Sequence, residues 1–310
     1  MPIKTIFAGT PEFALPYLKG LLDSPDFDVL GVITQPDKPS GRKQELTPSP
    51  VKILAQESGL KVFQPEKLRK DEAIAVELAA LQPDLLVVVA YGQIIPQTIL
   101  DLFPKGCINV HPSLLPKYRG ASPIQNAILN GDKETGVSIM LMDAQMDHGP
   151  ILAQSSTALT GEETNESLHR DLAVSGVPLL LKAAKDYIDK KIQPQPQNEA
   201  EATYCQTITK EDGRIAWQDE AVKIKNKIYA FYPWPATWTM LNGQRLKIFP
   251  PVEISDESLQ PGQVKINSEQ LIVGTGAGSL LLHQIQLEGK KPTDVGSFIR
   301  GLKSHDLSLS

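Results

Sequence analysis

Residues 84–111 read DLLVVVAYGQIIPQTILDLFPKGCINVH and contain two short apolar runs, LLVVV at 85–89 and GCINV at 106–110. Neither run alternates polar and apolar residues, which is the pattern of strands buried on both faces. Such strands belong to parallel sheets whose two faces are covered by helices. The stretch therefore predicts a doubly wound α/β sheet.

The same alternation of strands and helices extends from the N-terminus to residue 190. Apolar runs predict strands at 4–9, 27–35 and 136–143, and amphipathic segments predict helices at 51–57, 72–81, 122–131 and 165–190. A further helix is expected to begin after Gly9, with Thr10 as its N-cap and Pro11 as its first residue. We expect a Rossmann-like, mainly parallel sheet in this part of the chain.

The pattern changes after residue 189. Residues 190–208 contain two Gln-Pro pairs and few apolar residues, the composition of an extended linker. Beyond them, short strand signals are broken by Gly, Pro and Asn. The sequence therefore predicts a first domain at 1–189, a linker at 190–208 and a small C-terminal β-barrel, OB-like domain at 209–310.

Charge and composition restrict the class of function. The net charge is −5, which argues against a protein that grips nucleic acid over its whole surface. Residues 209–310 hold 12 Lys and Arg against 11 Asp and Glu, so the C-terminal part is the better candidate for contact with a polyanion.

Cysteine spacing and the N-terminus indicate the compartment. Cys107 and Cys205 lie far apart with no Cys-x-x-Cys motif, so we predict two buried thiols, with no disulfide and no metal site. No signal-peptide core and no apolar run long enough to span a bilayer is present, which predicts a cytoplasmic protein.

Asn109 and His111 lie two residues apart at the end of a predicted strand, so their side chains leave the same face. Ligands of open parallel sheets bind at the carboxyl ends of the strands. A carboxamide can donate to a developing oxyanion, and an imidazole can donate or move a proton at neutral pH. Asp143 and Asp147 are both candidates for the carboxylate that would orient the histidine.

Several longer segments resemble the folate-dependent formyltransferases, in particular the members that formylate a charged tRNA. The similarity lies in INVHPSLLPKYRGASPIQNAILNG (108–131), TGVSIMLMDAQMDHGPIL (135–152), FAGTPEFA (7–14), VITQPDKPSGR (32–42), TPSPVK (47–52), VVAYGQIIP (88–96), KEDGRIAW (210–217) and AFYPWPATW (230–238). It extends over nearly the whole chain.

The resemblance implies a reaction and its catalytic residues. The reaction is transfer of a formyl group from 10-formyltetrahydrofolate to the α-amino group of methionine on initiator tRNA. The family's catalytic Asn, His and Asp correspond to Asn109, His111 and Asp147, and Asp147 is preferred to Asp143 because the family has Gly two residues after its Asp, here Gly149. No metal is implied.

The resemblance also implies binding residues. Ser113, Leu114, Leu115 and Pro116 correspond to the segment that lines the folate pocket, and Tyr91 and Gly92 to its backbone and apolar walls. The Leu115-Pro116 sequence also permits a cis bond. The polar loop at 37–50 would reach the acceptor end of the tRNA through Arg42, Lys43 and Lys38. Lys43-Gln44-Glu45 departs there from a more glycine- and lysine-rich family pattern.

Other functions remain open at this point. A formyltransferase that acts on glycinamide ribonucleotide or an amino sugar nucleotide would share the Asn-His-Asp set, although the first of these needs no second domain. A non-catalytic folate- or RNA-binding module would more often have lost one of the three residues. We expect a monomer.

Overall fold

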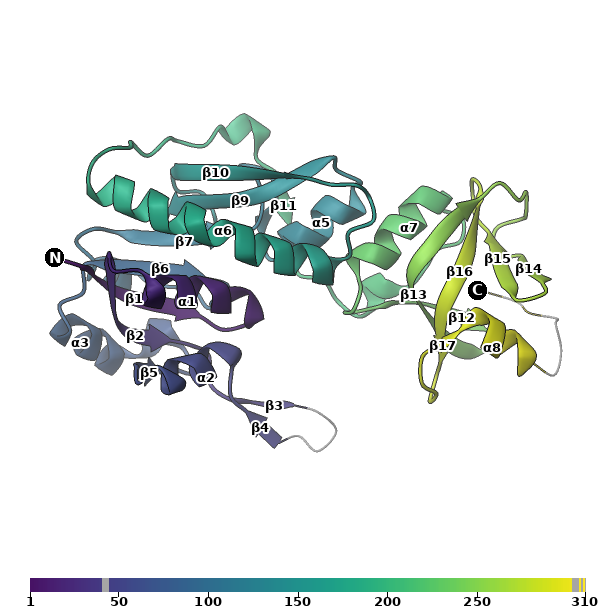
Figure 1. The fold of residues 1–310 in the computed structure, drawn as a ribbon, viewed down its shortest axis with the longest axis horizontal. Helices are drawn as coiled ribbons and strands as arrows, with labels where there is room; N and C mark the ends of the chain where they lie inside the picture. The colour runs from purple at the N-terminus through teal and green to yellow at the C-terminus, as the bar shows by residue number, and fades with distance from the viewer. Residues whose placement is uncertain (41–44, 303–306, 308, 310) are drawn as a thin grey trace. The chain divides into compact units, whose positions relative to one another are not determined.

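The computed structural model describes residues 1–310 except 41–44, 303–306, 308 and 310 (Figure 1). The chain divides into two compact units. The first unit contains Met1–Gly120, Gly136–Thr157 and His169–Tyr204, and the second contains Ala121–Thr135, Ala158–Leu168 and Cys205–Ser310.

A seven-stranded sheet forms the centre of the first unit, in the order β10-β9-β7-β6-β1-β2-β5. The strands are β1 (Ile3–Gly9), β2 (Phe27–Ile33), β5 (Lys61–Phe63), β6 (Leu85–Val89), β7 (Cys107–His111), β9 (Glu134–Leu141) and β10 (Ile151–Ala158). The pairs β1–β2, β1–β6, β2–β5 and β6–β7 are parallel, whereas β7 and β9 are antiparallel. The prediction of a Rossmann-like, mainly parallel sheet is confirmed.

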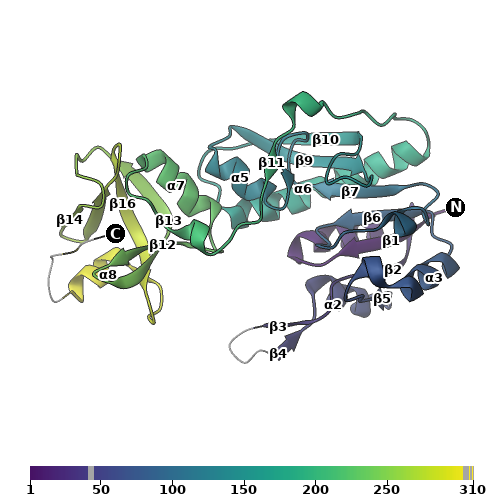
Figure 2. The same ribbon diagram turned by 180° about the vertical axis from the view of Figure 1, so that it is seen from behind.

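Helices cover both faces of this sheet (Figures 1 and 2). They are α1 (Leu15–Asp23), α2 (Pro50–Glu57), α3 (Glu72–Ala80), α4 (Gln97–Leu100) and α6 (Asn165–Ile188). Ile74 and Leu78 of α3 belong to one apolar cluster with Ile6 of β1 and Leu86 of β6. α6 lies against α1, where the Tyr17 hydroxyl donates to the Leu172 carbonyl at 3.0 Å. All five residues of β6 are buried, which explains its uninterrupted apolar sequence.

The start of the first helix differs from the prediction. A 3-10 turn, η1 (Glu12–Ala14), precedes α1, and Thr10 does not cap it. The Thr10 hydroxyl instead donates to the Tyr91 carbonyl at 3.0 Å. Tyr91 lies beyond the end of β6, where its carbonyl has no ladder partner, so this long-range bond replaces the expected local one.

The polar loop predicted at 37–50 contains regular structure. β3 (Lys38–Ser40) and β4 (Glu45–Thr47) pair as an antiparallel hairpin. The Ser49 hydroxyl then accepts from the Lys52 amide and caps α2. A helix over 51–57 was correctly predicted, but the hairpin was not.

The second unit is built on a six-stranded antiparallel sheet in the order β12-β13-β16-β15-β14, with β17 paired to β16. The strands are β12 (Thr237–Leu241), β13 (Gln244–Ser255), β14 (Val264–Asn267), β15 (Gln270–Gly274), β16 (Ser279–Leu287) and β17 (Thr293–Asp294). The helices are α5 (Pro123–Leu129), α7 (Ala221–Ala230) and α8 (Val295–Arg300). The prediction of a small β domain in the C-terminal part is confirmed, and its sheet is antiparallel; its closure into an OB-like barrel stays a prediction.

The segment predicted as a linker contacts the first unit over most of its length. Residues 190–204 group with the first unit. Ile151 and Gln195 exchange two backbone hydrogen bonds of 2.8 Å. Further along, β11 (Tyr204–Cys205) pairs with β8 (Arg119–Gly120), and the Arg119 amide donates to the Thr203 carbonyl at 2.8 Å.

Within the described part of the chain, no helix is long and apolar enough to cross a bilayer. Both cysteines are free and buried, as predicted. Burial, with a smaller contribution from Asp101, raises the pKa of the Cys107 thiol to about 12. This thiol is therefore uncharged and unreactive at neutral pH.

Candidate active site

Asn109 and His111 lie on β7, between β6 and β9 of the central sheet. β7 runs parallel to β6, so its last residue, His111, lies at the edge where the parallel strands end. Asn109 is half-buried and His111 is buried. The spacing of two residues places both side chains on one face of the strand, as the sequence predicted.

Asp147 approaches both of these side chains from the segment between β9 and β10. The Asn109 amide nitrogen, Nδ2, is 3.4 Å from Asp147 Oδ1 and donates to it. The other oxygen, Oδ2, is 3.7 Å from His111 Nδ1 and accepts a 2.8 Å hydrogen bond from the Gly120 amide. The structure thus brings together the three residues that the sequence singled out.

The hydrogen-bond partners of His111 restrict its protonation. Nε2 is 2.8 Å from the Tyr118 carbonyl, and a carbonyl oxygen only accepts, so Nε2 carries a hydrogen. Nδ1 faces the Asp147 carboxylate at a distance longer than a hydrogen bond. With that hydrogen on Nε2, Nδ1 has a lone pair in the neutral ring and carries a hydrogen only when the ring is protonated.

Asp143, the other candidate carboxylate, lies in a different arrangement. Its Oδ2 is 2.6 Å from Nδ1 of His148, and its Oδ1 accepts from the Gln145 amide at 2.8 Å. These contacts fix the turn after β9. Of the two aspartates that the spacing left open, Asp147 is the one beside His111.

The backbone around Asp147 is unusual. Asp147 has φ +50°, in the left-handed region that residues with a Cβ rarely adopt. Two residues later, a Cβ on Gly149 would lie 1.9 Å from the Leu141 carbonyl oxygen, so only glycine fits. Gln197 Nε2 donates to the carbonyls of both Asp147 and Gly149 at 2.8 Å.

The segment Ser113–Pro116, predicted to line a folate pocket, follows β7 directly. The Ser113 hydroxyl donates to the Lys117 carbonyl at 2.6 Å, and Ser138 Oγ donates to the Ser113 carbonyl at 2.6 Å. Leu114 is half-buried and Leu115 is buried. The Leu115-Pro116 bond is cis. The turn is therefore held by one hydrogen bond of its own and by one from Ser138 of β9.

Tyr91 and Gly92, the other predicted pocket residues, follow β6. The Tyr91 ring is buried in the apolar cluster around Ile6 and Leu86, and its hydroxyl has no hydrogen-bond partner among the described residues. Burial raises the pKa of this hydroxyl. Gly92 is exposed with φ +81°, and Gln35 Nε2 donates to the Tyr91 carbonyl at 2.9 Å.

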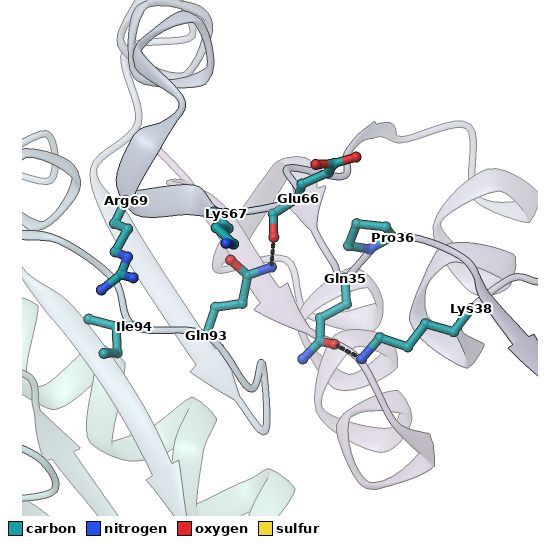
Figure 3. A pocket seen from close by; sticks show the side chains of 8 residues that line it. All are labelled: Gln35, Pro36, Lys38, Glu66, Lys67, Arg69, Gln93 and Ile94. Atoms are coloured by element: carbon teal, nitrogen blue, oxygen red, sulfur yellow. Dashed lines mark hydrogen bonds between the residues drawn. The ribbon is translucent and has the colours of Figure 1, made fainter.

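A cavity of about 530 Å³ opens at the same edge of the sheet (Figure 3). We call it the basic cavity; it is lined by Gln35, Pro36, Lys38, Glu66, Lys67, Arg69, Gln93 and Ile94. These residues follow the carboxyl ends of β2, β5 and β6. Its lining contains three cations and one carboxylate, and Arg69 lies beside the exposed Ile94 in Figure 3. Asn109, His111 and Asp147 do not line it.

The residues predicted to contact tRNA are only partly described. Arg42 and Lys43 lie outside the described residues. Lys38 lines the basic cavity, where its ammonium donates to Gln35 Oε1. Lys38 is thus brought together with Lys67 and Arg69, two residues that were not predicted to contact tRNA.

Sequence reasoning missed two sets of residues. The basic segment Lys67-Leu68-Arg69-Lys70 was a readable signal for the cavity, because two of its cations line it. The contacts of Gly120 and Gln197 with Asp147 had no such signal. They join residues 27 and 50 positions apart, and Gln197 lies in a segment that reads as a polar linker.

Two family models match the chain. The model described as formyl transferase matches residues 3–184, and the model described as formyl transferase, C-terminal domain, matches residues 207–303.

Curated relatives resemble the chain over nearly its whole length. The methionyl-tRNA formyltransferase of Geobacter sulfurreducens is 41% identical over 302 residues, which cover 97% of this chain and 94% of the relative. The methionyl-tRNA formyltransferase of Pseudomonas fluorescens is 46% identical over 291 residues, covering 94% and 90%.

Solved structures share the fold at low identity. WlaRD, a sugar 3N-formyltransferase crystallised with dTDP and 5-N-formyl-tetrahydrofolate, aligns with a TM-score of 0.68 at 21% identity, covering 94% of this chain and all of that one. HypX from Aquifex aeolicus in complex with tetrahydrofolic acid aligns with a TM-score of 0.62 at 18% identity, covering 99% of this chain and 51% of that one. These two likenesses concern the fold alone.

Proposed function

Because this chain belongs to the formyl transferase family, we propose that it transfers a formyl group from 10-formyltetrahydrofolate to the α-amino group of methionyl initiator tRNA. The family uses folate-derived formyl donors. The observation that supports the chemistry is the meeting of Asn109, His111 and Asp147 at the end of β7. The observation that supports the acceptor is the 41–46% identity to methionyl-tRNA formyltransferases over 94% or more of this chain.

Asn109 and His111 are assigned the role of stabilising the tetrahedral intermediate. The amine attacks the formyl carbon, the carbonyl oxygen gains negative charge, and the bond from that carbon to the folate nitrogen then breaks. Asn109 Nδ2 carries two hydrogens and donates only one of them to Asp147, over 3.4 Å, so the other can be donated to the oxyanion. His111 donates from Nδ1 when the ring is protonated, because Nε2 is held by the Tyr118 carbonyl. Each such donor contributes about 3 kcal/mol to the stability of the transition state.

Asp147 is assigned the proton that the attacking amine loses, directly or through a water molecule. Its Oδ2 holds the Gly120 amide at 2.8 Å and still faces His111, so the carboxylate is fixed but keeps acceptor capacity. The Tyr118 carbonyl anchors His111 Nε2, which leaves Nδ1 to face the reaction. The proton returns to the folate nitrogen as that group leaves.

Substrate contacts are proposed for two further regions. Ser113, Leu114, Leu115 and Pro116, with the backbone at Tyr91 and Gly92, would line the folate pocket. Arg42, Lys43 and Lys38 would contact the acceptor end of the tRNA. The basic cavity supports this assignment because Lys67 and Arg69 add two cations beside Lys38. The protein is proposed to work in the cytoplasm as a monomer. Light scattering of the purified protein tests the oligomeric state.

The acceptor is tested by comparing four acceptors in separate reactions. Purified protein is mixed with 10-formyltetrahydrofolate and one of four acceptors: methionyl initiator tRNA, methionyl elongator tRNA, glycinamide ribonucleotide or an amino sugar nucleotide. Formyl transfer is measured for each. Transfer confined to charged initiator tRNA is the expected result. Transfer only to a small amine would keep the chemistry and overturn the acceptor, and folate binding without transfer would favour a binding module.

A further inference from the structure

Gln197 lies in the polar segment after α6 and has hydrogen bonds to the loop that holds Asp147. Its Nε2 donates to the Asp147 and Gly149 carbonyls, each at 2.8 Å. His148 lies between these two residues, so the Gln197 amide bridges the main chain from Asp147 to Gly149. Among the described residues, Gln197 has no hydrogen bond to Asn109 or His111.

Arg119 fixes the orientation of the Gln197 amide. Gln197 Oε1 accepts from Arg119 Nε at 3.1 Å and from Nη2 at 2.8 Å. An arginine only donates and backbone carbonyls only accept, so the amide nitrogen must face the Asp147 loop. The guanidinium is 1% exposed and is itself held by both carboxylate oxygens of Glu199, at 2.6 and 3.0 Å. Gln197 is therefore a fixed donor.

The same two-residue strand, β8, also holds the side chain of Asp147. Gly120 follows Arg119 directly, and its amide donates to Asp147 Oδ2 at 2.8 Å. The main chain of Asp147 is thus bound through Gln197 and Arg119, and its carboxylate through Gly120. The two connections form a closed ring around a residue whose φ of +50° is unfavourable without external contacts.

We propose that Gln197 is a positioning residue for the reaction: through the Asp147 and Gly149 carbonyls it sets where the Asp147 carboxylate stands relative to Asn109 and His111. This inference rests on the proposed function, because it concerns the same three residues. The distances that Gln197 would govern are the 3.4 Å from Asn109 Nδ2 and the 3.7 Å from His111 Nδ1. Displacements of about 1 Å at reacting groups reduce rates by as much as about 100-fold.

The test compares Gln197→Glu with Gln195→Glu in the full-length protein. Glutamate at 197 keeps an oxygen for Arg119 but replaces the donor to the two carbonyls with an oxygen that repels them. Gln195 is exposed, and its side chain donates to the Gln193 carbonyl, away from Asp147, so the control makes the same change of charge two residues away. We expect kcat to fall about 10- to 100-fold in Gln197→Glu, with KM for tRNA and folate within about threefold, and Gln195→Glu to match the wild type.

Two further readouts separate positioning from a general structural effect. In an Asp147→Asn background, Gln197→Glu should lower kcat by less than about threefold, because both changes act on one group. The ¹⁵N resonances of the His111 ring should shift in Gln197→Glu and not in Gln195→Glu. An equal loss in both backgrounds, or an unchanged kcat and His111 spectrum, would overturn the proposal.

The experiment remains decisive if parts of it fail. Should circular dichroism show that Gln197→Glu is unfolded, Gln197→Met, which keeps the side-chain length without a donor, is compared by the same measurements. Should the wild-type protein formylate no tRNA, the proposed function fails, whereas the His111 spectrum still tests whether Gln197 positions the carboxylate.

Discussion

Two regions at the same edge of the central sheet are built in opposite ways. The side chains of His111 and Asp147 are 5% and 15% exposed, and backbone groups fix each of them. Lys67 and Arg69 of the basic cavity are exposed, and in the described part of the chain neither has a carboxylate within ion-pairing distance. A bond-forming step needs donors fixed to a fraction of an ångström, whereas attraction of phosphates acts over longer distances and tolerates mobile side chains. The two regions should therefore respond differently to substitution.

The largest effect is expected from Asp147→Asn. The amide replaces an acceptor near the Asn109 amide with a donor, and it cannot take a proton from the amine. We expect kcat to fall about 1,000-fold with little change in KM, since general base groups contribute about 10²- to 10⁴-fold. Formyl transfer at saturating substrates measures this.

Asp143→Asn is the matched control for that change. It is the same substitution four residues earlier, at a side chain that contacts His148 and the Gln145 amide. Its activity should stay within about threefold of the wild type, because it removes no group from the reacting atoms. Near wild-type turnover of Asp147→Asn would refute the assignment of the carboxylate.

Asn109→Ala is expected to have the next largest effect. It removes one donor to the oxyanion while leaving His111 and Asp147 in place. Loss of one such donor lowers kcat by about 10²- to 10³-fold. Single-turnover formylation gives the chemical rate directly, and a change confined to KM would show that Asn109 binds substrate without stabilising the transition state.

The combined substitution Lys67→Ala and Arg69→Ala should act on binding. We expect kcat/KM for tRNA to fall about tenfold, kcat to stay constant, and the slope of log affinity against log salt to decrease by about 0.7–0.9 for each phosphate that is no longer neutralised. Lys70→Ala is the control, since Lys70 is exposed and does not line the basic cavity. An unchanged salt dependence would remove the cavity from the tRNA path.

The smallest effect is expected from Tyr91→Phe. Tyr91 lies in the segment between β6 and the basic-cavity residues Gln93 and Ile94. Its hydroxyl is buried without a partner among the described residues, and such a group costs about 1–3 kcal/mol. Tyr91→Phe should therefore raise the free energy of unfolding in urea by about 1 kcal/mol and leave both KM values unchanged. A higher KM for folate would instead show that the hydroxyl contacts the donor.

The strands most readable from the sequence are those at the centre of the sheet. β6 and β7 are buried on both faces, so their composition alone identified them. β5 and β10 were missed because they lie at the two edges of the sheet. β5 has three residues, and β10 contains exposed polar residues such as Gln154 and Ser155, so pairing with a neighbour defines them more than composition does.

The site residues, like the strands, were predictable where the local sequence defines their position and not where distant contacts define it. The spacing of Asn109 and His111 within one strand placed them together by geometry alone. Asp147 was chosen over Asp143 by family resemblance, because spacing did not distinguish two aspartates in one turn. Gln197 was not predictable, since its contacts depend on how a polar segment folds back over the sheet.

The position of Gln197 along the chain also sets the order in which the site can form during synthesis. Gln197 is 50 residues after Asp147, and Glu199, which holds Arg119, is 80 residues after Arg119. At about 5–20 residues per second, a ribosome makes Asp147 roughly 3–10 s before it makes Gln197. A nascent chain that ends with α6 therefore already contains Asn109, His111 and Asp147, yet the contact that fixes the aspartate arrives only with the segment that leads into the second unit.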